Sequence, residues 1–309
     1  MLDFIEKYCK EYGTRFTKSQ KNKFIDEVVK DYKDLGYWTR VHECKQGIKR
    51  VKNILIGNVD TAKTIIVAPY DTPSKALFSK YKYYPLDRTK TVKQEKVNNY
   101  FQVIICLLIC SIAKYLLSLS DSFESNIKLL ITLFVVLLIG VSVKIYIGFS
   151  ARLCYNRNSV SIALIRDIAS KMNPEKAAII LLDYSISSFE GYKQVCDYYG
   201  NMISTKRFIL LNCLGENDSI VIGCRHNSLK FAKELLADEK SDISIEIKVL
   251  EDDVADKLPL FYFPNCLILT SGQYYNDDLV VYNTRSGKDS KVNISNVMKL
   301  ADMLLKKIC

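Results

Sequence analysis

Two apolar stretches in the middle of the chain limit its possible folds more than any other feature. Residues 97–113 (VNNYFQVIICLLICSIA) and 129–143 (LLITLFVVLLIGVSV) carry no charged side chain. Each stretch approaches the roughly 20 residues that a helix needs to cross a bilayer core. Lys114, Lys128 and Lys144 lie near the ends, where long side chains can reach the membrane surface. We therefore predict a hairpin of two transmembrane helices, about 99–119 and 128–149.

A soluble alternative to this hairpin is a pair of helices buried in a protein core. The second stretch is apolar on every face, whereas a helix at the surface of a soluble domain has one polar face. The pattern therefore favours the membrane interpretation.

The charges beside the apolar stretches predict the orientation of the hairpin. Between Lys75 and Val97 there are seven basic residues against two acidic ones, a net charge of +5, and the loop 118–126 has no Lys or Arg. Because cytoplasmic flanks are enriched in Lys and Arg, we expect a cell-membrane protein with both termini in the cytoplasm. The ten cysteines lack the spacing of a disulfide framework, and the charged N-terminal residues do not resemble a signal peptide.

The segment 74–98 before the first span is basic and aromatic. Its lysines alternate with Phe78, Tyr81, Tyr83 and Tyr84, a composition suited to anionic lipid headgroups; a solvated loop is the alternative. No nucleic-acid partner is expected, since the charge adjoins a span and no nucleic-acid motif accompanies it. The predicted contacts with membrane lipid are the basic residues Lys75, Lys80, Lys82, Arg88, Lys90, Lys93 and Lys96.

Residues 1–73 and 154–309 remain when the hairpin 99–149 is set aside, and they predict one α/β domain. Apolar runs at 64–69 and 177–182 indicate buried strands, and they alternate with segments of helical periodicity. Further strands are expected at 38–43, 51–56, 208–213, 220–224, 243–250 and 266–270, and helices at 16–36, 159–172, 191–199, 229–236 and 292–308. This alternation predicts a mostly parallel, twisted sheet with helices on both faces.

Six segments of this domain have sequences with known counterparts, in the same order. They are YGTRFTKSQKNKFIDEVVKDYKDLGYWTRVHE, NILIGNVDTAKTIIVAPYDTP, NRNSVSIALIRDIAS, IILLDYSISSFEGY, ILLNCLG and LVVYNTRSGKDSKVNISNVMKLADMLLKKI. Together they resemble the clan MH zinc aminopeptidases. That family includes leucine-type aminopeptidases and glutaminyl cyclase, and also non-enzymatic relatives such as the transferrin receptor ectodomain. The resemblance implies a zinc aminopeptidase-like fold.

The same resemblance implies a site for two zinc ions, held by His and carboxylate ligands, with a Glu as general base. Pro69 stands where the family has its first His ligand, and Asp71 keeps the carboxylate that supports that His. The bridging Asp falls on Arg157, a permanent cation that would repel zinc.

The remaining positions of the family site differ in the same way. The general-base Glu falls on Ser185, and the neighbouring Glu ligand falls on Ile186. The next Asp ligand falls on Asn212, and the last His ligand falls on Asn283. The resemblance thus implies a degenerate member with no catalytic residue, no metal ion and no cofactor.

A replacement site elsewhere would have to use scarce residues. The chain has two histidines, of which His42 is expected on an edge strand and His226 follows Cys224 in a weak metal-ligand pattern. Ser185 lacks the flanking glycines of a nucleophile elbow. We predict instead that Arg157 pairs with Asp71 and fills the former metal centre; the alternative is an Arg157 that points to solvent or to lipid headgroups.

These patterns predict a membrane-anchored, catalytically inactive aminopeptidase-like protein that serves as a scaffold or binding subunit. Its expected partners are membrane lipid and an integral membrane protein, such as a transporter or a peptide-processing subunit, with a peptide in the cleft as a further candidate. The alternatives are an active membrane-bound metallo-aminopeptidase with relocated ligands, and a purely structural or lipid-interacting subunit.

Overall fold

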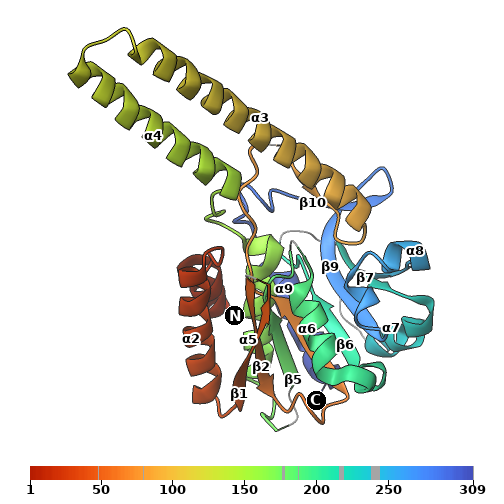
Figure 1. Ribbon diagram of the computed structural model, residues 1–309. Coiled ribbons are helices and arrows are strands. Elements are labelled where there is room, and N and C mark those ends of the chain that lie inside the picture. Colours follow the sequence, from red (N-terminus) through yellow and green to blue (C-terminus); the bar gives the residue numbers. More distant parts are fainter. Residues whose placement is uncertain are drawn as a thin grey trace.

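A computed structural model describes residues 1–47, 49–78, 80–175, 178–186, 188–215, 219–237 and 244–308. It has two parts, an α/β domain and a long helical hairpin that projects from one end of it (Figure 1). Both chain ends lie in the α/β domain. Ala177 and Ile243, the first residues of two predicted strands, lie outside the described residues.

The elements follow the predicted alternation of strands and helices. The strands are β1 (Thr39–Gln46), β2 (Lys49–Gly57), β3 (Thr64–Pro69), β4 (Lys82–Tyr83), β5 (Ala178–Leu182), β6 (Arg207–Leu211), β7 (Ser219–Cys224), β8 (Ile245–Val249), β9 (Cys266–Tyr275) and β10 (Asp278–Tyr282). The α-helices are α1 (Leu2–Ile5), α2 (Lys18–Asp34), α3 (Arg88–Ser120), α4 (Ser125–Ile147), α5 (Val160–Ala169), α6 (Glu190–Tyr199), α7 (Leu229–Leu236), α8 (Asp252–Ala255) and α9 (Ile294–Ile308). Two π-helical turns, η1 (Glu6–Glu11) and η2 (Tyr155–Ser159), and three short 3-10 turns, η3 (Gly200–Thr205), η4 (His226–Ser228) and η5 (Pro259–Phe261), complete the list.

The strands form one open, mixed sheet in the order β1-β2-β5-β3-β6-β9-β10-β4, with β7 and β8 joined to the other side of β9. Its centre is parallel, because β5, β3, β6 and the first half of β9 all run in one direction. The flanking pairs are antiparallel, through β1 and β2 on one side and β7, β10 and β4 on the other, except for β8, which is parallel to β7. The prediction of a mostly parallel sheet therefore holds for the centre and is wrong for the sheet as a whole.

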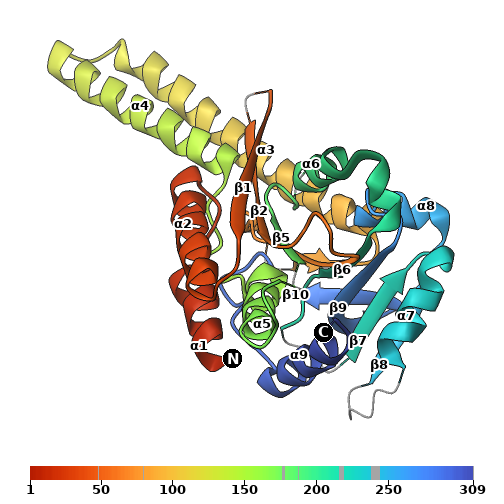
Figure 2. The ribbon, with the colours of Figure 1, turned by 90° about the horizontal axis from the view of Figure 1, so that it is seen from below.

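Helices cover both faces of the sheet, as predicted. Alternate residues of each central strand point to opposite faces. In β3, for example, Ile66 packs toward α2, α5, α7 and α9, whereas Ile65 and Val67 pack toward α6 and the segment around α8. The view along the sheet shows these two helical layers (Figure 2). Each face of the sheet thus has its own hydrophobic core. These cores fix the register of the strands, since a slip by one residue would move every side chain of a strand to the opposite face.

The hairpin consists of α3 and α4, which are long enough and apolar enough to cross a membrane. At 1.5 Å per residue, the 33 residues of α3 span about 50 Å and the 23 residues of α4 about 35 Å. The two helices pack on each other, and the Gln102 amide donates to the Ile145 carbonyl at 3.2 Å. Most of their large apolar side chains face outward and are exposed.

Helix α3 begins eleven residues before the predicted span, at Arg88, where the Asp87 side chain caps it by accepting from the Lys90 amide at 3.0 Å. Its first turns lie across the α/β domain, with Thr91 and Asn98 fully buried. The Asn98 side chain accepts from the Leu77 amide at 2.8 Å. The end of the segment 74–98 is therefore part of a helix that runs without interruption from the domain into the hairpin (Figure 1).

Candidate functional site

Arg157 lies in η2, a π-helical turn that leads directly into α5. Turns of this kind are rare and are often found at functional sites. The backbone amides of Asn156 and Arg157 donate to the Asp289 carboxylate, at 2.9 and 3.4 Å. This turn places the Arg157 side chain at the carboxyl ends of the central strands, with 6% of the residue exposed.

Neutral groups surround the Arg157 guanidinium. It donates to the Asn212 side-chain oxygen at 2.5 Å, contacts the Cys213 sulfur at 3.8 Å and lies 3.9 Å from the centre of the Tyr83 ring. Burial alone would lower the pKa of Arg157, but the neighbouring Tyr83 and Cys213 raise it, so the side chain stays charged. No carboxylate forms an ion pair with Arg157 among the described residues.

Asp71 lies just beyond β3 and binds the loop that follows β5. Its carboxylate accepts from the Ser185 hydroxyl, from the Ser185 amide at 3.2 Å and from the Ile186 amide at 3.3 Å. The predicted Arg157–Asp71 pair is therefore wrong, because each side chain has its own set of partners. The alternative, an Arg157 that points to solvent or headgroups, is wrong as well, since Arg157 is buried.

The structure brings four of the seven predicted site positions around one small cavity of about 20 Å³. These four are Pro69, Arg157, Ser185 and Asn212. A space of this size holds about one water molecule. Asp71 is joined to this group through Ser185. Ile186 and Asn283 are not among the residues that line the cavity.

Four residues in loops that follow strands of this region have an unusual backbone. Tyr184 and Phe189 after β5, Cys213 after β6 and Asn283 after β10 have positive φ angles of 44°, 54°, 58° and 62°. Such a conformation costs a non-glycine residue on the order of 1 kcal/mol or more, and it clusters at functional sites. The carboxyl ends of these strands thus have the strained backbone that is typical of a binding or catalytic site.

Tyr83 is the site residue that sequence analysis missed. We expected it at the membrane surface, but it is buried, because β4 pairs with β10 and turns its ring toward Arg157. The Asn212 amide nitrogen donates to its hydroxyl at 3.1 Å. Tyr81, also expected at headgroups, is buried too. The alternation Lys80-Tyr81-Lys82-Tyr83 is a period of two, and this signal could have predicted a strand with its tyrosines inward.

The seven basic residues predicted at the membrane surface fall into two groups. Lys82, Arg88 and Lys90 contact the α/β domain: Lys82 lies 3.5 Å from the centre of the Tyr275 ring, Arg88 lies 5.1 Å from that of Phe189, and Lys90 pairs with Asp278 at 2.6 Å. The other four are exposed, namely Lys75, Lys80, Lys93 and Lys96.

The residues at this site do not fit the zinc ions of the resembled family. A zinc site needs three or four nitrogen, sulfur or carboxylate ligands. Here the positions present a proline, an isoleucine, two asparagines and a guanidinium, and the Asn212 oxygen already accepts from Arg157. Across the described residues no group of three or more His, Cys, Asp or Glu could hold a metal ion.

Two nucleophilic side chains, those of Ser185 and Cys213, lie at the cavity or beside Arg157. The Ser185 hydroxyl donates to the Asp71 carboxylate, and no hydrogen bond joins it to a histidine among the described residues. Burial raises the pKa of the Cys213 thiol to about 11, although Arg157 opposes this shift, and the thiol is therefore protonated at neutral pH. His42 lies on β1, 5.2 Å from the Tyr198 ring centre, and His226 lies in η4.

An open cleft of about 350 Å³ adjoins the filled site on the side of the hairpin. Asp71 and Ile186 form part of its wall, and Glu95 and Asn99 of α3 form another part. Arg285 also lines it and donates to the Ser74 carbonyl at 2.7 Å. The hairpin thus enters beside the cleft, since in the sequence it lies between Asp71 and Arg157.

Comparisons with known proteins identify the fold. No family model and no curated protein matches the sequence. Among solved structures, a glutaminyl cyclase from Fimbriiglobus ruber is similar over 99% of this chain and 93% of its own, with 12% identity and a TM-score of 0.53. A Zn-dependent exopeptidase from Parabacteroides distasonis is similar over 96% and 93%, with 10% identity and a TM-score of 0.55. A glutaminyl cyclase from Macrostomum lignano is similar over 100% and 89%, with 9% identity and a TM-score of 0.55. At these identities the likeness confirms the aminopeptidase-like fold and carries no conclusion about chemistry.

Proposed function

We propose that this chain is a membrane-anchored, catalytically inactive relative of the zinc aminopeptidases and glutaminyl cyclases, and that it acts as a binding subunit of a membrane protein complex. Three features support the proposal: the side chains at the former metal centre, the apolar hairpin, and the cleft between the hairpin and the domain.

The single observation that carries the proposal is the buried Arg157. By the sequence resemblance it stands where the family has its bridging carboxylate, and in the structure it contacts Tyr83 and Asn212. A divalent cation beside this guanidinium would meet a like charge and no ligand set. Without a metal the site lacks the Lewis acid with which the resembled enzymes activate water. The Ser185 hydroxyl is bound to Asp71, and burial keeps the Cys213 thiol protonated.

Anchoring is supported by the length and outward apolar surface of α3 and α4. Exposed lysines at the base of α3, among them Lys93 and Lys96, support a cytoplasmic location of the α/β domain. In this orientation the cleft beside Glu95 and Asn99 opens close to the membrane surface. A cytoplasmic segment of a neighbouring membrane protein, such as a transporter or a peptide-processing subunit, can reach it there.

The test of inactivity uses the purified full chain in detergent. Hydrolysis of aminoacyl substrates and cyclisation of an N-terminal glutaminyl peptide are measured with and without added zinc or cobalt, and bound metal is measured by elemental analysis. We expect no activity above the buffer rate and no stoichiometric zinc. Activity that a chelator abolishes would overturn the proposal and favour a metallo-aminopeptidase with relocated ligands.

The test of the binding role uses native membranes. Cross-linking followed by affinity purification of the full chain should recover an integral membrane protein in a fixed ratio. A Glu95→Lys variant, which changes the charge of the cleft, should lose that partner, whereas an exposed Asp253→Lys control should retain it. Equal recovery by both variants would contradict a partner in the cleft.

A further inference from the structure

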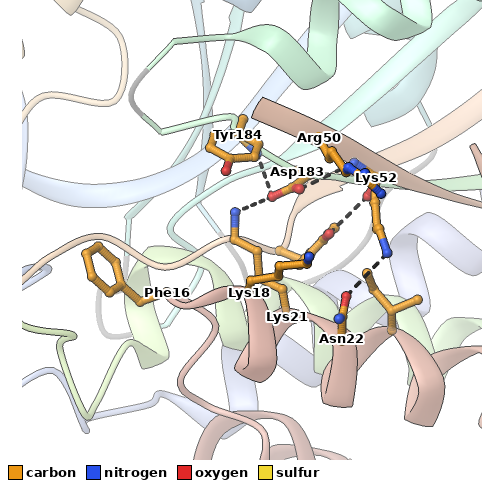
Figure 3. Close-up of a pocket in the computed structure, with 10 residues that line it drawn as sticks. Phe16, Lys18, Lys21, Asn22, Arg50, Lys52, Asp183 and Tyr184 are labelled. Atoms are coloured by element: carbon orange, nitrogen blue, oxygen red, sulfur yellow. Dashed lines mark hydrogen bonds and ion pairs between the residues drawn. The ribbon is translucent and has the colours of Figure 1, made fainter. Parts of the chain in front are cut away.

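A second cavity of about 190 Å³ lies between α2 and β2, outside the filled metal centre. We call it the α2–β2 pocket. It is lined by Phe16, Lys18, Lys21, Asn22, Ile25, Arg50, Lys52, Tyr70, Asp183 and Tyr184. Figure 3 shows the residues of α2 on one wall and those of β2 on the other, with Asp183 between them. Its volume is many times what one water molecule needs, so it has room for a polar ligand.

Positive charge dominates this pocket. Four of its side chains are cationic, whereas its one carboxylate, Asp183, is buried and already paired with Lys21 at 2.5 Å. Asp183 also accepts from the Tyr184 amide at 2.9 Å and the Lys52 amide at 3.3 Å. A second carboxylate nearby, Glu43, lies 3.5 Å from the Arg50 and Lys52 side chains.

The pocket therefore retains unneutralised cations. Four positive charges face the two carboxylates, which leaves an excess of two. Lys18 at the start of α2 makes no side-chain hydrogen bond or ion pair in the described part of the chain. Lys49 approaches from β2 and lies 5.5 Å from the centre of the Tyr184 ring. A concave site with uncompensated lysines and an arginine attracts anions, and phosphate above all.

Tyr184 is an independent sign of a binding site. Its φ of 44° is a left-handed conformation that is costly for an aromatic residue. This conformation holds the ring at the pocket, with the Lys21 ammonium 3.9 Å from its centre. Strain that persists at one wall of a cationic cavity is typical of a pre-arranged ligand site.

The pocket adjoins the cleft at the base of the hairpin. Phe16, Lys21 and Tyr184 line both cavities, and the cleft extends to Glu95 and Asn99 of α3. The predicted first span begins at Asn99, so the cleft lies where the proposed membrane surface begins. A lipid headgroup at that surface can thus approach the pocket without crossing the domain.

We propose that the α2–β2 pocket binds the phosphate of an anionic phospholipid headgroup. Lys18, which has no ion pair among the described residues, and Arg50, which shares the single carboxylate of Glu43 with Lys52, supply the excess charge. Lys21 and Lys52 are held in place by their bonds to Asp183 and Asn22. Phe16 and Tyr184 form the apolar wall toward the acyl chains. The lipid assignment rests on the membrane anchoring proposed above, whereas the binding of a phosphate group does not.

The test measures binding of dihexanoyl phosphatidylglycerol, dihexanoyl phosphatidylcholine and glycerol 3-phosphate to the detergent-solubilised full chain, by native mass spectrometry and calorimetry. The pocket variant is Lys18→Gln/Arg50→Gln, because both side chains are exposed and their loss leaves the Lys21–Asp183 pair intact. The matched control is Lys23→Gln/Lys30→Gln, which removes two exposed lysines of the same helix outside the pocket.

We expect phosphatidylglycerol to bind more tightly than phosphatidylcholine, and the pocket variant to lose about tenfold or more in affinity, since each cation near an anionic headgroup contributes a factor of several. The control should stay within about twofold. Equal losses of affinity in the two variants would mean that the lipid binds to surface charge in general and not to a site. An unchanged affinity in the pocket variant would mean that the pocket does not contribute to binding. Each of these results would overturn the proposal. Glycerol 3-phosphate bound in place of the lipid would overturn the lipid assignment. Retention of the chain in membranes after alkaline extraction tests the anchoring separately.

Discussion

The contact between Arg157 and Tyr83 can be measured as a coupling free energy. Substituting Tyr83→Leu removes a ring that lies 3.9 Å from the guanidinium and an acceptor for the Asn212 amide. A desolvated cation–ring contact is worth about 2 kcal/mol, and a hydrogen bond about 1 kcal/mol. With the loss of packing volume, we expect a destabilisation of about 4 kcal/mol.

The same substitution should cost less when the cation is absent. In an Arg157→Met background the ring has no charge to stabilise, so Tyr83→Leu should cost about 2 kcal/mol less than it does in the natural chain. For a chain of this size, about 2–4 °C of melting temperature corresponds to 1 kcal/mol. The double-mutant cycle should therefore show a non-additivity of about 4–8 °C in thermal melts of the detergent-solubilised full chain.

A matched cycle controls for general effects of core substitution. Tyr199 is buried and lies beside Phe208 at the start of β6, whereas Arg157 bonds to Asn212 just past the end of that strand. Arg157→Met and Tyr199→Leu should therefore be additive within about 0.5 kcal/mol. If the Tyr83 cycle were equally additive, the ring would not stabilise the buried charge, and our account of the filled metal centre would be refuted.

Three further predictions follow from other contacts. Asp71→Asn should lower the melting temperature by about 4–8 °C, because the carboxylate accepts three hydrogen bonds from the loop after β5 and the neutral amide replaces an acceptor by a donor; an unchanged midpoint would contradict this role. Gly191→Ala should destabilise by about 1–3 kcal/mol in the same assay, since its Cβ would lie 2.1 Å from the backbone carbonyl oxygen of Asp183, and a neutral result would refute the packing. Burial would raise the pKa of Asp31, but the hydrogen bonds from Arg166 outweigh this effect and hold the pKa below 3.8. The stabilisation of the fold by the charged Asp31 carboxylate is therefore present above about pH 4 and is lost as the pH falls below that value. Melting temperatures measured against pH should show this loss in the natural chain and a smaller loss in Asp31→Asn.

Much of the fold could be predicted from the sequence because its central strands are apolar runs with clear ends. The strand expected at 64–69 agrees with β3, and those at 177–182 and 220–224 agree within one residue with β5 and β7. Strand β10 was missed in the sequence. The tight turn that joins β9 to β10 consists of Asn276 and Asp277, which have positive φ angles, and no glycine marks this turn.

The contents of the site could be predicted only in part. The sequence positions of Asp71 and Arg157 could be inferred by resemblance, and the structure places Asp71 just beyond β3 and Arg157 beside Asn212, just beyond β6. Their partners could not be inferred, because they depend on β4, a strand of two residues whose pairing with β10 is set by tertiary contacts. Basic residues such as Lys90 could likewise be identified as a positive segment, but their ion pairs arise only when α3 lies against the domain.

The uninterrupted helix α3 has a mechanical consequence. Its first turns are fixed to the domain by Thr91, Asn98 and the Lys90–Asp278 pair, and no hinge separates them from the apolar turns beyond Asn99. A change in the tilt of the apolar turns therefore rotates the α/β domain as well, because both are parts of one continuous helix. Where α3 spans a bilayer, the thickness of that bilayer sets the tilt of the helix, and the tilt in turn sets the angle at which the sheet and its cleft face the membrane plane. Lipid composition would then control the orientation of the whole α/β domain relative to the membrane through the continuous helix α3.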